Sequence, residues 1–333
     1  MKFAFMGLRH GHIFMLLRQV EQHPDATITA ICEEDAQTRK TLTAERDIRI
    51  THEKFTEMLT DVECDAVAIG DYYGKRGKLA ITALEAGKHI ILDKPICTRL
   101  EELEQITALS QERGLRVGCQ LDLRSDDALA TARALIQDGI LGDIATVSFS
   151  GQHPLMLDGR PDWYFVAGQH GGTINDIAIH GIDAIPWITG LLFDQVVAAR
   201  GWNAKTPKFP HFQDCGQLML RMENGAGVLG DVSYLAPDKC GYGAPQYWRF
   251  TFHGEDGVLE VRHGDREISL ATHTDDSIRQ LPVEPSTARG YLQDFLDEAA
   301  GCAGPETLTT KDVLNSTRVT LKTQAAADSS STL

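Results

Sequence analysis

Residues 1–12 read MKFAFMGLRHGH, and this stretch decides how the N-terminal part of the chain folds. The apolar run Lys2 to Met6 ends at Gly7, and a helical pattern from His12 to Gln22 follows. A strand that ends at a glycine and opens a helix is typical of a dinucleotide-binding fold, with the pyrophosphate at the helix N-terminus. Arg9 and His12 stand at the second and third glycine positions of G-x-G-x-x-G. We expect Arg9 to supply compensating charge there; a tight turn without a ligand is the alternative.

The same alternation of strands and helices continues to about residue 120. Runs with little polar alternation predict strands that are covered on both faces, as in a parallel sheet: Ala26–Cys32, Ala66–Gly70, His89–Leu92 and Leu115–Cys119. Helical patterns lie between them, the clearest being Gly77–Ala86 and Arg99–Glu112. This order predicts an α/β Rossmann domain, a doubly wound parallel sheet, over residues 1–122.

The pattern changes beyond residue 123. Alternating or β-branched segments predict a largely antiparallel open sheet: Ile144–Ser150, Val196–Gly201, Gln217–Met222, Gly227–Tyr234, Tyr247–His253 and Gly257–Arg262. Helical patterns accompany them at Asp126–Asp138, Thr173–Thr189, Tyr291–Ala300 and Asp312–Ala326. We therefore expect a second, α+β domain over residues 123–333.

Composition excludes several classes of protein. The chain has 333 residues, which exceeds the usual size of a single core and favours two domains. Its 32 Lys and Arg against 47 Asp and Glu give a charge of −15, which disfavours nucleic-acid and anionic membrane partners. The seven cysteines are scattered and indicate neither disulfides nor a thiolate metal site. With no signal or membrane-spanning segment in the sequence, we expect a cytoplasmic protein.

Two short motifs follow predicted strands of the first domain. Glu33, in Cys32-Glu33-Glu34-Asp35, lies 26 residues after Gly7 and is predicted to bind the adenosine ribose. Adjacent Glu34 would help to repel a 2′-phosphate, so NAD is favoured over NADP; for Glu34 and Asp35 a role at the start of the next helix is the alternative. Lys94, in Asp93-Lys94-Pro95, is placed to donate to a substrate hydroxyl, unless it is a solvated surface lysine.

A third motif lies in the second domain, Gly171-Gly172-Thr173-Ile174-Asn175-Asp176-Ile177-Ala178-Ile179-His180-Gly181-Ile182-Asp183. At helical spacing, Asp176, His180, Asp183 and Trp187 share one face and the isoleucines share the other, which predicts a functional face and a core face. His180 suits a general base that takes a proton from an alcohol. An ordinary i,i+4 charge pair is the alternative.

Together these motifs resemble the Gfo/Idh/MocA family of NAD(P)-dependent oxidoreductases, along essentially the whole chain. The glycine turn, the acidic-Lys-Pro block and the G-G-x-x-x-D-x-x-x-H-x-x-D block occur in the family's order and spacing. The resemblance implies that the domain over residues 123–333 binds substrate and forms oligomer contacts. It also implies that Lys94 holds the reacting hydroxyl, His180 is the acid/base, and Asp176 binds substrate and His180. The implied cofactor-binding residues are Gly7, Arg9, His10, Gly11, His12, Glu33, Asp71, Asp93 and Lys94.

Substrate residues are expected mainly in the loop from His153 to Tyr164. His153, Arg160 and Trp163 offer groups that bind polyol hydroxyls and sugar faces, although packing of the loop over the sheet is an equal alternative. Arg124 resembles a basic residue of the family, and Asp122 competes with it for the same alignment. The reacting alcohol is expected where the two domains meet.

The function expected from the sequence is hydride transfer between NAD and a secondary alcohol of a sugar or cyclitol by a homo-oligomer. An NAD-dependent glycosidase that oxidises its substrate transiently and a non-catalytic NAD or sugar sensor are the alternatives. Several histidines, among them His10 and His12, make a metal enzyme a further alternative. The spacing fixes no third ligand, so no metal site is assigned.

Overall fold

The computed structural model describes residues 1–330, which form two units. The N-terminal unit comprises residues 1–120, 168–170 and 291–315, and the C-terminal unit comprises the remainder. This differs from the single division between residues 122 and 123 expected from the sequence. Phe295 explains part of the difference, because its ring packs against Phe3 of the first strand, with the ring centroids 6.2 Å apart. Residues late in the chain thus complete the early core.

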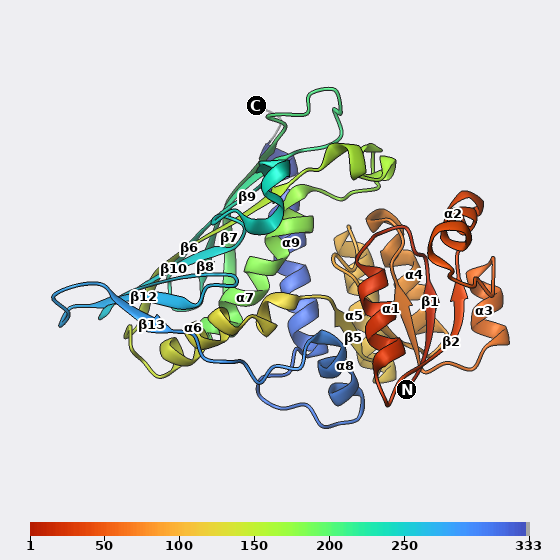
Figure 1. The fold of residues 1–333 in the computed structure, drawn as a ribbon, viewed down its shortest axis with the longest axis horizontal. Coiled ribbons are helices and arrows are strands. Elements are labelled where there is room, and N and C mark those ends of the chain that lie inside the picture. The colour runs from red at the N-terminus through yellow and green to blue at the C-terminus, as the bar shows by residue number, and fades with distance from the viewer. Residues whose placement is uncertain (331–333) are drawn as a thin grey trace. The chain divides into compact units, whose positions relative to one another are not determined.

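The N-terminal unit contains a five-stranded parallel sheet, which confirms the predicted Rossmann fold (Figure 1). The strands, in spatial order, are β2 (Thr27–Cys32), β1 (Lys2–Met6), β3 (Ala66–Ile69), β4 (His89–Leu92) and β5 (Val117–Cys119). The helices are α1 (Ile13–Gln22), α2 (Ala36–Arg46), α3 (Phe55–Asp61), α4 (Tyr73–Glu85), α5 (Leu100–Arg113) and α8 (Tyr291–Ala299). Because β1 lies between β2 and β3, the chain order reverses there, which is where such sheets bind ligands.

The C-terminal unit contains an eight-stranded sheet, and every strand pair in it is antiparallel except β6 with β9. In spatial order the strands are β13 (Arg279–Pro282), β12 (Glu267–Thr272), β11 (Gly257–Arg262), β10 (Arg249–Gly254), β6 (Ile144–Pro154), β9 (Gly227–Ala236), β8 (Cys215–Met222) and β7 (Phe193–Trp202). The helices are α6 (Asp127–Gln137), α7 (Ile179–Thr189) and most of α9 (Thr310–Ser330). The predicted largely antiparallel sheet is confirmed, with β12 and β13 in addition.

The helix that carries His180 differs from the sequence expectation. Residues Ile174–Ala178 form a π-helical turn, and α7 begins only after it. Side chains are buried all round this segment, so it has no open polar face opposite an apolar one. A π turn changes the angular spacing of side chains and is often found at functional sites.

None of the helices within residues 1–330 combines the length and apolar character needed to cross a bilayer.

Candidate functional site

The glycine turn between β1 and α1 is held by backbone N–H groups that donate to neighbouring segments. Gly7 has a φ of +72°, and a Cβ there would lie 2.6 Å from the Cβ of Asp71, so only glycine fits. Leu8 N donates to Glu33 Oε2 at 2.7 Å, and His10 N donates to the carbonyl of Gly70 at 3.1 Å. The turn is therefore fixed by the segments that follow β2 and β3.

Glu33 lies beneath this turn and is fully buried, where the sequence expectation made it a ribose acceptor. Its second oxygen accepts from Asp35 N at 2.9 Å. Burial raises the pKa of Glu33, and the N–H groups of Leu8 and Asp35 oppose that rise. A carboxylate has about four acceptor positions, so a ribose hydroxyl would share oxygens that already hold the turn.

Cations offset the acidic groups that follow β2 and β3. Arg9 lies 3.3 Å from Asp35 and 3.7 Å from Asp71, with its guanidinium 5.3 Å from the centre of the Tyr72 ring. Arg9 thus faces the acidic groups, whereas the sequence expectation placed it over the pyrophosphate.

Lys75 bridges two further carboxylates, Asp71 and Glu34, each at 2.9 Å. Burial opposes its charge, but these carboxylates outweigh burial and raise the pKa of Lys75 to about 12. The repulsion of a 2′-phosphate expected from the acidic residues alone is correspondingly reduced.

Arg76 of α4 clamps the turn after β4. The guanidinium is fully buried and pairs with both oxygens of Asp93, at 2.8 and 3.2 Å. It also donates to the carbonyls of Asp93, Lys94 and Pro95 at 2.8 to 3.1 Å. Burial would raise the pKa of Asp93, but Arg76 and His10 hold it well below its usual range. Asp93 is therefore ionised, and the backbone of Lys94 is fixed.

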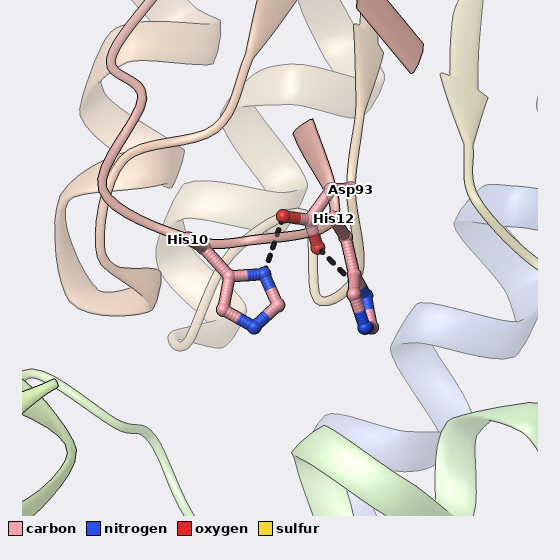
Figure 2. Close-up of side chains that lie close together, drawn as sticks. All are labelled: His10, His12 and Asp93. Carbon is pink, nitrogen blue, oxygen red and sulfur yellow. Dashed lines mark hydrogen bonds and ion pairs between the residues drawn. The ribbon is translucent and has the colours of Figure 1, made fainter. Parts of the chain in front are cut away.

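Two histidines of the glycine turn also lie next to Asp93 (Figure 2). His10 Nδ1 lies 2.6 Å from Asp93 Oδ2, and His12 Nδ1 lies 3.8 Å from Asp93 Oδ1. His10 is buried and contacts the hydroxyl of Tyr73 through Nε2 at 3.1 Å. The side chain of His10 thus points into the protein, toward Asp93, where the sequence expectation placed it on the cofactor.

Within the part of the chain that the structure describes, these three side chains also form a group of residue types that can bind a metal ion. Their ligand atoms lie within 4.8 Å of one another, so Asp93 is the third group that spacing alone did not fix. Two histidines and a carboxylate suit Zn²⁺. Asp93, however, is already bound by Arg76 and His10, and the cation of Arg76 opposes a second cation. We therefore treat the group as a hydrogen-bonded ion-pair network.

In the C-terminal unit, Asp176 and His180 are both buried, and each meets a partner from another element. The hydroxyl of Tyr234 on β9 donates to Asp176 Oδ2. His180 Nδ1 lies 3.5 Å from Asp122 Oδ1, and its ring meets Trp248 with a centroid separation of 5.5 Å. Asp122 is half-exposed, so it can orient His180 and keep contact with water.

Arg124, expected to bind substrate, is used inside the C-terminal unit. It pairs bidentately with Asp183 of α7 at 2.8 and 2.7 Å, and Ser316 donates to the same carboxylate at 3.0 Å. Both charged side chains are buried. The contacts of Arg124 and Asp183 are thus explained by the packing of α7 and α9.

The loop from His153 to Tyr164 also uses much of its polarity internally. Arg160 donates to the carbonyls of Leu155 and Pro154 and stacks near the rings of Tyr164 and Tyr234. Four aromatic side chains surround His153, with their ring centroids 4.9 to 6.5 Å from that of the imidazole: Tyr234, Tyr242, Tyr247 and Trp248. Trp163 is buried against Tyr164. The aromatic set around His153 was not singled out by the sequence.

Gly172, in the third motif, lies close to α9. A Cβ on Gly172 would lie 2.2 Å from the side-chain amide of Gln324 on α9, and Gln324 Oε1 accepts from Asn175 N at 3.2 Å. The group that lies close to Gly172 is thus the Gln324 side chain of α9, in the same unit.

Two protein-family models together match most of the chain. A family model for the oxidoreductase family with an NAD-binding Rossmann fold matches residues 1–121. A model for the GFO/IDH/MocA C-terminal domain matches residues 129–260.

Individual relatives are more distant. The scyllo-inositol 2-dehydrogenase (NAD(+)) of Bacillus subtilis is 30% identical over 179 residues, which cover 53% of this chain and 50% of the relative. Levoglucosan dehydrogenase of Pseudarthrobacter phenanthrenivorans is 25% identical over 250 residues, 67% of this chain and 62% of that protein. The structure of an oxidoreductase from Thermotoga maritima has a TM-score of 0.83 at 27% identity and covers 99% of this chain and 98% of its own.

Proposed function

The chain belongs to the Gfo/Idh/MocA family of oxidoreductases, and from this premise we propose that it transfers hydride between NAD and a secondary alcohol of a sugar or cyclitol. The observation that carries the proposal is the fixed Lys94 turn at the carboxyl end of β4, next to the glycine turn of an NAD(P)-binding Rossmann fold. Relatives named for inositol and levoglucosan support the substrate class.

The residues of the N-terminal unit fit a dinucleotide. The glycine turn opens α1, whose N-terminal N–H groups and dipole favour a pyrophosphate. Glu33 would accept from the ribose with the same oxygens that hold the glycine turn, and when bound the nicotinamide would supply the hydride acceptor. Our proposal is that NAD is preferred over NADP, with Glu33 responsible for the preference.

Each proposed reactive group has a defined role. Lys94 holds the hydroxyl and stabilises its developing negative charge. His180 takes the hydroxyl proton, and Asp122 orients its imidazole. Asp176, fixed by Tyr234, binds the substrate. The alcohol thus loses one hydride to the cofactor and one proton to His180.

The test uses turnover of a panel of polyols and sugars together with calorimetry of NAD and NADP. Lys94→Ala and His180→Ala are each expected to lower turnover by on the order of 10²-fold or more, the scale for a lost acid/base group, while NAD still binds. Lys78→Ala, a solvent-facing lysine of α4, is the control. Wild-type turnover in the His180 variant would remove His180 as the base, and NADP binding as tight as NAD would remove the role of Glu33.

A glycosidase that oxidises transiently remains the second candidate from the sequence. It would hydrolyse a glycoside without net formation of NADH, so product analysis beside absorbance at the NADH band separates the two reactions. A sensor would bind NAD and a sugar and turn over neither.

A further inference from the structure

We propose that His10 is a positioning residue: it joins the turn that holds the cofactor to the turn that carries Lys94. The inference rests on the proposed function, because it assigns His10 a part in the hydride-transfer step. His10 stands inside the glycine turn, in a motif where the second and third glycines are absent. His10 occupies one of the variable positions of G-x-G-x-x-G, and its side chain links this turn to Asp93.

The geometry is a chain of four buried side chains from three strand ends. Tyr73 begins α4 after β3, His10 follows β1, and Asp93 follows β4. The contacts are Tyr73 Oη to His10 Nε2 at 3.1 Å, His10 Nδ1 to Asp93 Oδ2 at 2.6 Å, and Asp93 to Arg76 at 2.8 Å. Three loops that surround the expected ligand position are thus joined through side chains.

The proton positions in this chain follow from charge. Asp93 is ionised and only accepts, so His10 Nδ1 carries a proton and donates to it. Burial lowers the pKa of His10 against the pull of Asp93, with Arg76 and Lys94 acting in the same sense as burial. The ring is therefore neutral at pH 7, and Nε2 accepts from the hydroxyl of Tyr73. One tautomer and one ring orientation are fixed.

This arrangement bears on rate because hydride transfer depends on placement. The glycine turn sets where the dinucleotide lies, and the turn at Asp93 sets where Lys94 lies. A misplacement of about 1 Å can cost on the order of 10²-fold in rate. Cutting the contact between His10 and Asp93 should loosen the link between the two turns, which then rests on the longer 3.8 Å contact of His12 Nδ1 with Asp93 Oδ1.

The experiment compares three variants. His10→Ala removes both contacts; His10→Asn keeps an N–H donor near the position of Nδ1 and loses the contact with Tyr73. His23→Asn, at the other end of α1, is the matched control. The readouts are NADH affinity, the fluorescence lifetime of bound NADH, turnover, and the primary deuterium isotope effect on turnover. The lifetime needs no substrate, so it tests the inference even if no polyol is oxidised.

We expect His10→Ala to bind NADH within about threefold of wild type, to shorten the NADH lifetime, to lower turnover by on the order of 10²-fold and to raise the isotope effect. His10→Asn should recover most of the lifetime and turnover. If His10→Ala does not fold, His10→Asn becomes the deciding variant. We expect its NADH lifetime and turnover to be near those of the wild type.

Three results would overturn the inference. Unchanged lifetime and turnover in His10→Ala would show that the two turns need no such link. An Asn variant as defective as the Ala variant would show that donation to Asp93 is not the function of His10. Stoichiometric zinc in purified wild type, lost in His10→Ala and in His12→Ala, would make the group a metal site.

Discussion

Arg124 and Asp183 show how a residue expected to bind substrate serves packing. Their bidentate pair is buried, and Ser316 donates to the same carboxylate. Removing one partner of such a pair leaves an uncompensated buried charge. Replacing both by apolar groups of similar volume avoids that charge.

We therefore expect Arg124→Ala to lower the free energy of unfolding by about 3–5 kcal/mol, measured by urea denaturation. Arg124→Met combined with Asp183→Leu should lose less than the single variant. Arg221→Ala is the control, because Arg221 forms a similar bidentate pair with Asp194 that is exposed, and such pairs contribute at most about 1 kcal/mol. Full stability of Arg124→Ala, together with weaker substrate binding, would restore Arg124 to the substrate site.

Glu33 shows what its spacing from Gly7 along the chain can predict and what that spacing cannot predict. Its distance along the chain from Gly7 predicts its place after β2, and the structure has it there. Its burial depends on the N–H of Leu8, a contact between positions 25 residues apart. Arg76 and Tyr234 were missed, and Asp122 was not tied to His180, for the same reason. Arg76 stands beside Lys75 and near Lys78, and nothing local distinguishes it from those lysines.

At the scale of elements, Asp126 joins a helix start to a hairpin. Its carboxylate caps α6 by accepting from Leu129 N, accepts from Gly264 N, and lies 2.7 Å from His263 Nδ1. The hydrogen bond and charge of Asp126 outweigh burial and raise the pKa of His263 above 6.5. Protonated His263 therefore stabilises the folded state.

The pH dependence follows from that direction. The contribution of His263 is fully present below pH 6.5 and is lost as pH rises through its raised pKa. Denaturation series at about pH 6 and about pH 9 should show a stability gap between wild type and His263→Gln that is larger at the lower pH. His273→Gln, at an exposed histidine just after β12, is the control substitution; a stability gap for His263→Gln that is equal at both pH values would contradict the assignment.

The elements that the sequence predicted carry a clear hydrophobic pattern, and those it missed do not. β1, β3 and β4 are short runs of buried apolar residues, which a parallel sheet requires. α2 has one buried residue, Leu42, and β13 has none, so neither carries a strong hydrophobic pattern. The π turn before α7 depends on packing around residues 174–178, which the isoleucine spacing does not reveal.

At the scale of the whole molecule, the outer face of the eight-stranded sheet exposes large apolar side chains. Met219 and Leu229 are cross-strand partners, and Leu235 lies on the same face of β9. Each is more than 40% exposed. Apolar side chains that gather on one face often mark a contact between proteins, and we propose that a second copy of the chain covers them.

Met219→Glu combined with Leu229→Glu should therefore convert the oligomer to monomer in analytical ultracentrifugation, with the far-UV circular dichroism unchanged. Ile278→Glu is the control, because Ile278 is 67% exposed and lies outside the strands of the sheet. Wild type that sediments as a monomer, or a double variant with wild-type mass, would remove this face as the contact.

The division of the chain between its two units has a consequence for biosynthesis. The Rossmann sheet ends with β5 at Cys119, yet its unit also includes residues 291–315, which are made about 200 residues later. At roughly 5–20 residues per second, the ribosome needs about 10–40 s to reach them. During that interval Phe3 has no Phe295 to pack against, so the nascent sheet should expose apolar surface and attract chaperones.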